Sequence, residues 1–226
     1  MIKMDLRKAY DSVSWDFLFS VMNEMGFPPR FVDWIKMCVS TLSFSILVNG
    51  IPQEPFKAKK GLRQGDPISP YLFAIAMEYL SRLMRKQCDT SGFHFHPRCS
   101  LVRITHLLFA DDLLMFCRAD IHSVQSMMNT FNRFSKASGL EANNSKSNVY
   151  VSGVDTQCKE QILRYLHMDE GSFPFRYLGV PLHSKKLNTR ECRPWWTKLL
   201  AESATGLLVY CHMQVGSSLF GVLLEA

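Results

Sequence analysis

Two adjacent aspartates, Asp111 and Asp112, lie between two apolar runs of strand length. Each run is apolar on both faces, so we expect two buried strands joined by a hairpin with Ala110 and Asp111 at its tip. Carboxylates held this close repel each other, and the pKa of one must rise unless a cation neutralises them. The pair therefore indicates a metal site, although aspartates also suit an ordinary turn.

A third acid and a glycine-rich loop extend this pattern. Asp5 follows a short apolar segment at the start of the chain, and residues 61–73 form a Gly-Arg-Gln-Gly loop that leads into a helix. These residue types suit two-metal nucleotidyl transfer, in which two ions about 3.5–4 Å apart activate a hydroxyl and stabilise a leaving oxygen. Mg²⁺ takes only one or two protein carboxylates, and phosphate oxygens complete its shell. We predict that Asp5 and Asp111 bridge the ions. Asp112 supports them, and Leu6 lends its backbone carbonyl.

Five blocks of sequence follow one another in a fixed order. They are residues 5–11 (DLRKAYD), 61–73 (GLRQGDPISPYLF), 109–112 (FADD), 139–146 (GLEANNSK) and 175–182 (FRYLGVPL). In this order they resemble the motifs of the reverse transcriptase of non-LTR (LINE-type) retrotransposons, most closely the plant kind. The similarity covers roughly residues 1–198. An Asp-Asp pair alone is a weak signal, whereas the ordered set is highly specific.

The resemblance implies both a fold and an activity. The fold is α+β, a reverse-transcriptase-like palm with an antiparallel sheet, packed helices and a split βαβ pattern. The activity is RNA-directed DNA polymerase, with Mg²⁺ or Mn²⁺ as cofactor and an RNA template, a DNA primer and a dNTP as partners. We expect a palm domain at residues 1–185 and a degenerate thumb-like tail at 186–226, with the family's fingers region missing. We expect no membrane association, and no stable protein partner can be inferred from the sequence.

The resemblance also gives roles to residues around the nucleotide. Tyr10 is expected to stack under its sugar and to exclude a 2′-hydroxyl by pocket shape. Gln64 and Gly65 resemble the loop that lies against the nucleotide and the template base, where glycine lets the backbone come close. Arg63 is expected to contact phosphate. The alternatives are a core tyrosine, a turn before a helix, and an ion pair between Arg63 and Asp66.

Two further motifs are given roles in the same way. Lys146 resembles the lysine proposed to protonate the leaving pyrophosphate as a general acid; the alternative is a surface lysine after a turn. Tyr177, Leu178 and Gly179 fall in the primer-grip motif. We interpret Asp11 as an ion-pair partner and Asp16 as a charge in the first turn of a helix.

Hydrophobic periodicity predicts the elements that must position these residues. Ser14 is expected to cap the first long helix, and Ser69 with Pro70 to cap the helix after the loop. Asn49-Gly50 is typical of a tight hairpin. The expected helices are residues 15–25, 29–39, 71–86, 124–138 and 155–166, and the expected strands include 44–48, 147–151 and 176–182.

Composition narrows the class of protein. A hydrophobic content of 47% argues against disorder, and a net charge of +6 permits contact with nucleic acid. Lys57, Lys59 and Lys60 precede the Gln64 loop and would attract phosphate; the alternative is a solvated charged hairpin. The seven cysteines form no Cys-x-x-Cys pair and no secretory signal opens the chain. Reduced thiols in the nucleus or cytoplasm are therefore expected, not secretion.

Two other features carry weaker interpretations. His94, His96 and Cys99 lack a second ligand pair, so we interpret them as a strand with outward histidines, not a zinc site. Residues 206–224 carry no charge but contain glycines and polar residues, so a spanning helix is not expected. The segment beyond Lys198 is expected to add little to the fold.

Two other functions remain open. One is a non-catalytic retroelement remnant that folds as a palm and at most binds RNA. The other is a palm-fold nucleotidyl cyclase, which the residues 61–73 loop and the Tyr-Leu-Gly strand fit poorly. Because positioning matters as much as the metals, a chain without fingers cations is expected to extend a primer poorly.

Overall fold

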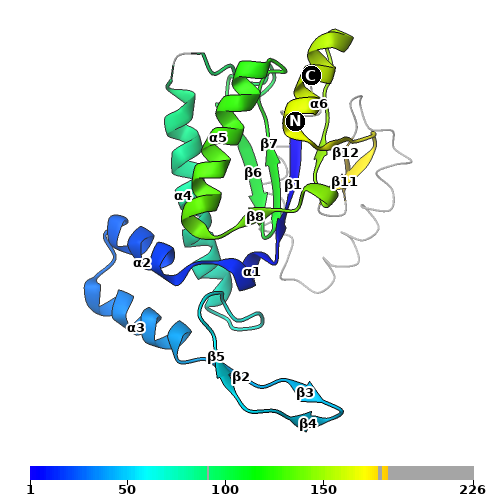
Figure 1. Cartoon of the computed structure of the whole chain (residues 1–226). Helices are drawn as coiled ribbons and strands as arrows, with labels where there is room; N and C mark the ends of the chain where they lie inside the picture. The colour runs from blue at the N-terminus through cyan, green and yellow to red at the C-terminus, as the bar shows by residue number, and fades with distance from the viewer. Residues whose placement is uncertain (91, 178–179, 183–226) are drawn as a thin grey trace, which may run out of the picture.

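The computed structural model describes residues 1–90, 92–177 and 180–182 of the chain. Their central element is a sheet with the strand order β10-β9-β1-β7-β6 (Figure 1). The strand β8 pairs with the last two residues of β1, whereas β9 pairs with its first two. Neighbouring strands are antiparallel except β9 and β10, so the described chain is α+β with an antiparallel-dominated sheet. The strands are β1 (Ile2–Arg7), β6 (His106–Phe109), β7 (Asp112–Met115), β8 (Glu141–Ala142), β9 (Asn148–Val149) and β10 (Asp169–Glu170).

The helices begin and end largely where the sequence predicts. Ser14 accepts a hydrogen bond from the Phe17 backbone N–H, and Gly139 ends a helix with a φ of 77°, a conformation that glycine adopts readily. Asp16 lies in the first turn of α2, as predicted. The helices are α1 (Ala9–Ser12), α2 (Trp15–Glu24), α3 (Pro29–Ser40), α4 (Ser69–Cys88), α5 (Ile121–Ser138) and α6 (Thr156–Leu166).

The main core lies between one face of the sheet and the helices α2, α4 and α5. Every second residue of β1 is buried on this face: Ile2, Met4 and Leu6. On β7, Leu113 and Met115 are buried on the same face. The period of two along a strand and the helical period of the facing elements bring these side chains together. Met127 and Met128 of α5 fill this core, as predicted.

A narrow arm made of two strand pairs projects away from this body (Figure 1). Its strands are β2 (Ser43–Phe44), β3 (Leu47–Val48), β4 (Ile51–Pro52) and β5 (Phe56–Lys57). The Asn49-Gly50 turn is confirmed, because both residues have positive φ values of 52° and 80°. Strand 44–48 is interrupted, however, because the ladder breaks at Ser45 and Ile46. All residues of the four short strands are exposed, so the arm has little burial among the described residues to keep a longer ladder regular.

Four other predictions of elements are wrong or only partly right. Ser69 does not cap α4: it is a buried residue inside the helix, and the Asp66 carboxylate accepts a hydrogen bond from the Ile68 backbone N–H instead. Residues 93–96 form no strand; His94 pairs with Asp120 at 3.5 Å. Strand 176–182 is a hairpin of β11 (Phe175–Tyr177) and β12 (Val180–Leu182). The predicted strand 147–151 is reduced to β9.

No helix of the described residues is long and apolar enough to cross a membrane. The predicted tail at residues 186–226, with the uncharged stretch 206–224, lies outside the described residues.

Candidate nucleotidyl-transfer site

The register of β1 against β7 brings two of the predicted carboxylates together. Asp5 is the direct antiparallel partner of Asp112, so both side chains leave the same face of the sheet. Directly opposed residues have Cβ atoms about 4.5–5.5 Å apart. Ala110 turns the hairpin with a φ of 50°, and Asp111 follows it. The Asp111 carbonyl accepts a hydrogen bond of 3.2 Å from the Leu6 N–H. The fold thus gathers the three aspartates at one end of the sheet.

The electrostatics of this pair fit a cation. Burial raises the pKa of Asp112; the Lys3 charge opposes this rise, while Asp111 and Asp5 add to it. Hard carboxylate oxygens are the ligands that Mg²⁺ and Mn²⁺ accept. Within the described residues no three His, Cys, Asp or Glu side chains already form a group that could hold a metal ion. The aspartates still fit a Mg²⁺ site of the kind in which one or two carboxylates bind the ion and substrate phosphate completes its shell.

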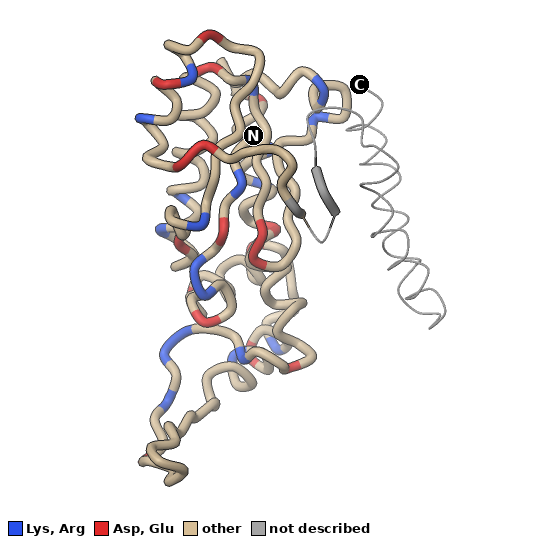
Figure 2. The backbone as a smooth tube through the Cα atoms, turned by 90° about the vertical axis from the view of Figure 1, so that its right-hand side faces the viewer, with Lys and Arg blue, Asp and Glu red and all other residues tan. Residues whose placement is uncertain are grey.

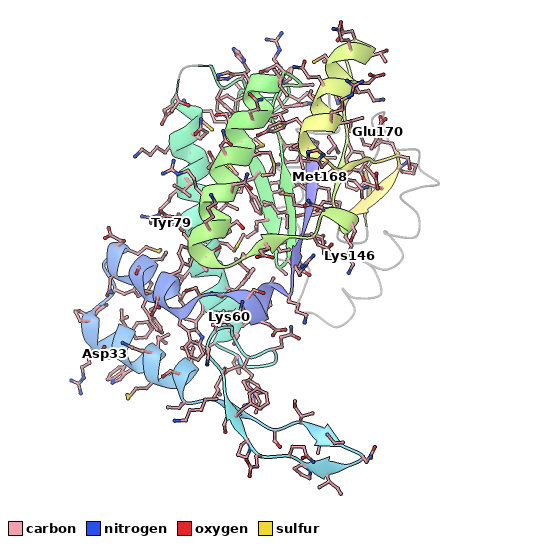
Figure 3. All side chains as sticks on the ribbon, in the orientation of Figure 1. Asp33, Lys60, Tyr79, Lys146, Met168 and Glu170 are labelled. Atoms are coloured by element: carbon pink, nitrogen blue, oxygen red, sulfur yellow. The ribbon has the colours of Figure 1, made fainter. Side chains whose placement is uncertain are left out.

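A turn that includes Lys146 is attached directly to the Asp5 backbone. The Asn143 N–H donates to the Asp5 carbonyl at 2.8 Å, and the Asp5 N–H donates to Ser147 Oγ at 3.3 Å. Ser147 Oγ also donates to the Asn143 carbonyl at 2.8 Å, which closes the turn around the 3₁₀ helix η1 (Asn144–Lys146). Lys146 is exposed on this turn beside the lower end of the sheet (Figure 3). No sequence signal singled out Ser147, because its partner is 142 residues away.

The Gln64 loop is anchored to the chain that leaves β1. Gly61 donates from its N–H to the Val13 carbonyl at 2.8 Å, and Leu62 donates to the Tyr10 carbonyl at 2.7 Å. The Trp15 indole N–H donates to the Gly61 carbonyl at 2.7 Å. A Cβ at position 61 would lie 2.6 Å from a backbone oxygen, and its φ is 91°, so only glycine fits this crossing.

The nucleotide residues predicted from the motifs lie around this crossing. Tyr10 is half-buried, and its ring stacks on Phe73 with centroids 4.8 Å apart. Gln64 and Gly65 are exposed, and no atom lies within 4 Å of where a Cβ on Gly65 would be. The loop therefore leaves its backbone open to a ligand.

Among the described residues, neither the alternative Arg63–Asp66 ion pair nor the predicted ion pair of Asp11 is found. Arg63 is exposed. The Asp66 carboxylate is used by the turn into α4. Lys57, Lys59 and Lys60 are exposed where the arm joins the body, and Figure 2 shows basic residues along that connection.

The last predicted motif covers the carboxylate face of the sheet. Phe175 and Tyr177 of β11 are buried against Leu114 and Tyr150 in a second, smaller cluster. Burial raises the pKa of Tyr177 to about 12, and the charge of Asp112 contributes to the rise. Leu178 and Gly179 lie outside the described residues.

The sequence analysis missed Lys3 and its contact with Phe175 on this face. Lys3 lies two residues before Asp5 on the same face, and its ammonium is 5.8 Å from the centre of the Phe175 ring. The strand period of two could have identified Lys3 once Asp5 was assigned. Nothing in the sequence pairs Phe175 with it, because that contact depends on how the β11–β12 hairpin packs.

Comparison with known proteins identifies the family of this chain. The chain is an α+β domain whose residues 1–182 match the family model described as reverse transcriptase (RNA-dependent DNA polymerase). The match covers most of the chain. The protein therefore belongs to the reverse transcriptase family.

Its relatives include proteins of non-LTR elements. The chain is 30% identical over 192 residues to the retrovirus-related Pol polyprotein from type-1 retrotransposable element R2 of Popillia japonica. It is 27% identical over 158 residues to the corresponding type-2 R2DM protein of Drosophila melanogaster. These alignments cover 81% and 70% of the chain but only 31% and 14% of the relatives. An uncharacterized mitochondrial protein of Arabidopsis thaliana is 45% identical over 67 residues, 29% of the chain and 55% of that protein.

Proposed function

We propose that this chain is the palm module of the RNA-directed DNA polymerase of a non-LTR retroelement and acts by two-metal nucleotidyl transfer. The observation that carries the proposal is the direct pairing of Asp5 with Asp112 across β1 and β7, with Asp111 at the adjoining turn. Family membership and the R2 relatives support the polymerase class. The chain spans less than a third of those relatives' length, so their full activity is part of the proposal.

In this mechanism each group of the chain has a defined task. Asp5 and Asp111 would hold the ions, with Asp112 in support and the Leu6 carbonyl as a further oxygen ligand. When bound, Mg²⁺ or Mn²⁺ supplies charge to the attacking and leaving oxygens. The chain itself fixes the ligands: the Leu6–Asp111 hydrogen bond holds the hairpin tip against β1.

The nucleotide would lie between the carboxylates and the Gln64 loop. The hydrogen bonds from Gly61 and Leu62 to the segment after β1 set the position of Tyr10 relative to that loop. Stacking on Phe73 holds the Tyr10 ring in one orientation, which steric exclusion of a 2′-hydroxyl requires. Gln64 and Gly65 offer open backbone to the base, and Arg63 offers charge to phosphate.

Two groups would act on the products and the primer. Lys146 is exposed on the turn bonded to Asp5, which suits a general acid for pyrophosphate. The β11–β12 hairpin, which includes Tyr177, is the proposed primer grip. The local identity of 45% to an Arabidopsis protein supports the proposed plant kind.

A non-catalytic, RNA-binding palm is the second candidate. The observation that favours it is the exposed group of basic residues before the Gln64 loop, which can contact RNA without any metal site. This candidate keeps the basic surface of Lys57, Lys59 and Lys60 and predicts no DNA synthesis.

Primer extension distinguishes the two candidates. The chain is incubated with poly(rA), oligo(dT), dTTP and Mg²⁺ or Mn²⁺, and an RNA-binding assay is run in parallel. We expect weak, template-dependent incorporation that Asp111→Asn abolishes without changing RNA affinity. RNA binding without any incorporation, in both metals and at long incubation, would support the non-catalytic palm.

A further inference from the structure

The carboxylate face of the sheet also carries a positively charged side chain, Lys3 of β1. In the β1–β7 register Lys3 is opposite Leu114 while Asp5 is opposite Asp112, so all four side chains leave one face. Lys3 and Asp112 are therefore diagonal neighbours. Diagonal positions are about 7–8 Å apart, which is within reach of a lysine side chain. The register thus places a positive charge beside a carboxylate that two other acids already repel.

The Lys3 side chain also contacts an aromatic ring of β11. Its ammonium lies 5.8 Å from the centre of the Phe175 ring, within the range of a cation–π interaction. Phe175 is itself fixed, because its ring packs on Tyr150 at 4.5 Å and belongs to the buried cluster that includes Leu114. Lys3 is half-buried as a result. A lysine packed in this way loses much of the freedom that makes exposed ion pairs weak.

We propose that Lys3 is the resident counter-charge of the metal site: it lies diagonal to Asp112 and supplies the positive charge of the aspartate cluster before a metal ion arrives. This inference rests on the proposed function, because it assigns the metal to the same aspartates. Two consequences follow from Coulomb's law. Removing the lysine charge should make the metal-free cluster less stable, and it should make a divalent cation bind more tightly, because a competing cation is gone.

The test measures Mn²⁺ binding to the full chain by electron paramagnetic resonance, together with melting temperatures in EDTA and in excess Mn²⁺. Lys3→Met keeps the length and the packing on Phe175 but removes the charge, and Lys3→Arg keeps the charge. We expect Lys3→Met to tighten Mn²⁺ binding about three- to tenfold, in line with a partly screened charge. It should lower the melting temperature in EDTA more than in excess Mn²⁺. Lys3→Arg should stay within about twofold of the parent.

Asp5→Asn shows where the Mn²⁺ binds. If this variant binds Mn²⁺ much more weakly and Lys3→Met binds like the parent, the lysine only packs and the inference is overturned while the site stands. If Asp5→Asn binds like the parent, the ion lies elsewhere, and both the site and the inference fail. Lys3→Gln is the substitute if Lys3→Met does not fold, and the same tightening is expected.

Discussion

The two faces of the β1–β7 strand pair differ in what they hold. One face presents Met4 and Leu113 to the helices, where neither exposes any surface. The other presents Lys3, Asp5 and Asp112, which are only half-buried. Consecutive residues of one strand therefore serve a dry core and a polar site, because side chains alternate at a period of two.

The difference shows how a charged site can be held rigidly at small cost to the fold. Apolar burial on the helix side fixes the backbone of both strands, at roughly 25 cal/mol for each Å² of apolar surface removed from water. The carboxylates on the opposite face then need not contribute to stability. They remain partly hydrated, which limits the penalty of placing like charges together.

The largest expected effect falls on the polar face. Asp5→Asn should reduce metal-dependent incorporation at least about a hundredfold, because it removes a proposed ligand of both ions. Its melting temperature in EDTA should stay equal to that of the parent or rise, since a repelling charge is lost. Asp16→Asn is the matched control, as Asp16 is an exposed acid in the first turn of α2. Equal losses in both variants would contradict a local role for Asp5.

A pair of adjacent leucines compares the two faces by stability. Leu113 belongs to the main core and Leu114 to the small cluster under β11, and both are almost fully buried. We expect Leu113→Ala to cost about 3–5 kcal/mol and Leu114→Ala about 2–3 kcal/mol, because a small cluster collapses more readily around a cavity. Chemical denaturation measures both. An equal or larger cost at Leu114 would show that the β11–β12 hairpin is as much a part of the core as the helices.

The smallest expected effect is a pH dependence of folding stability that arises from a histidine on the helix side of the sheet. His106 of β6 is within hydrogen-bond distance of Ser81 at 2.9 Å and Thr105 at 3.0 Å, and burial, aided by Arg85, lowers its pKa. The unfolded chain therefore takes up the proton first. The stability that this histidine contributes is fully present above its ordinary pKa of about 6.5 and is lost as pH falls below it.

The same histidine can be tested by substitution. His106→Gln should lose less stability than the parent between pH 7.5 and pH 5, as measured by denaturant unfolding at each pH. His122→Gln, at an exposed histidine of α5, is the control and should follow the parent. If His106→Gln follows the parent as well, the acid sensitivity arises from other groups.

Local features of the fold were predictable because their causes are local. The Ala110–Asp111 turn, the Ser14 cap and the Gly139 end depend on residues within one or two turns of chain, and the structure has all three. The order of the five blocks is also a property of the sequence alone, and the family match over residues 1–182 spans all five. The Ser69 cap was wrong although it too looked local, because packing buries that hydroxyl inside α4.

Contacts between distant segments were decided by the tertiary structure alone. The sequence provides Asp5 and Asp112, but a shift of one residue in the β1–β7 register would send one carboxylate into the helix side. That register is set by burial of Met4 and Leu113, not by the aspartates. The Ser147 bond to Asp5 and the placement of Phe175 over Lys3 have the same origin. Periodicity determines which residues share a face, whereas the packing of the whole core determines which faces meet.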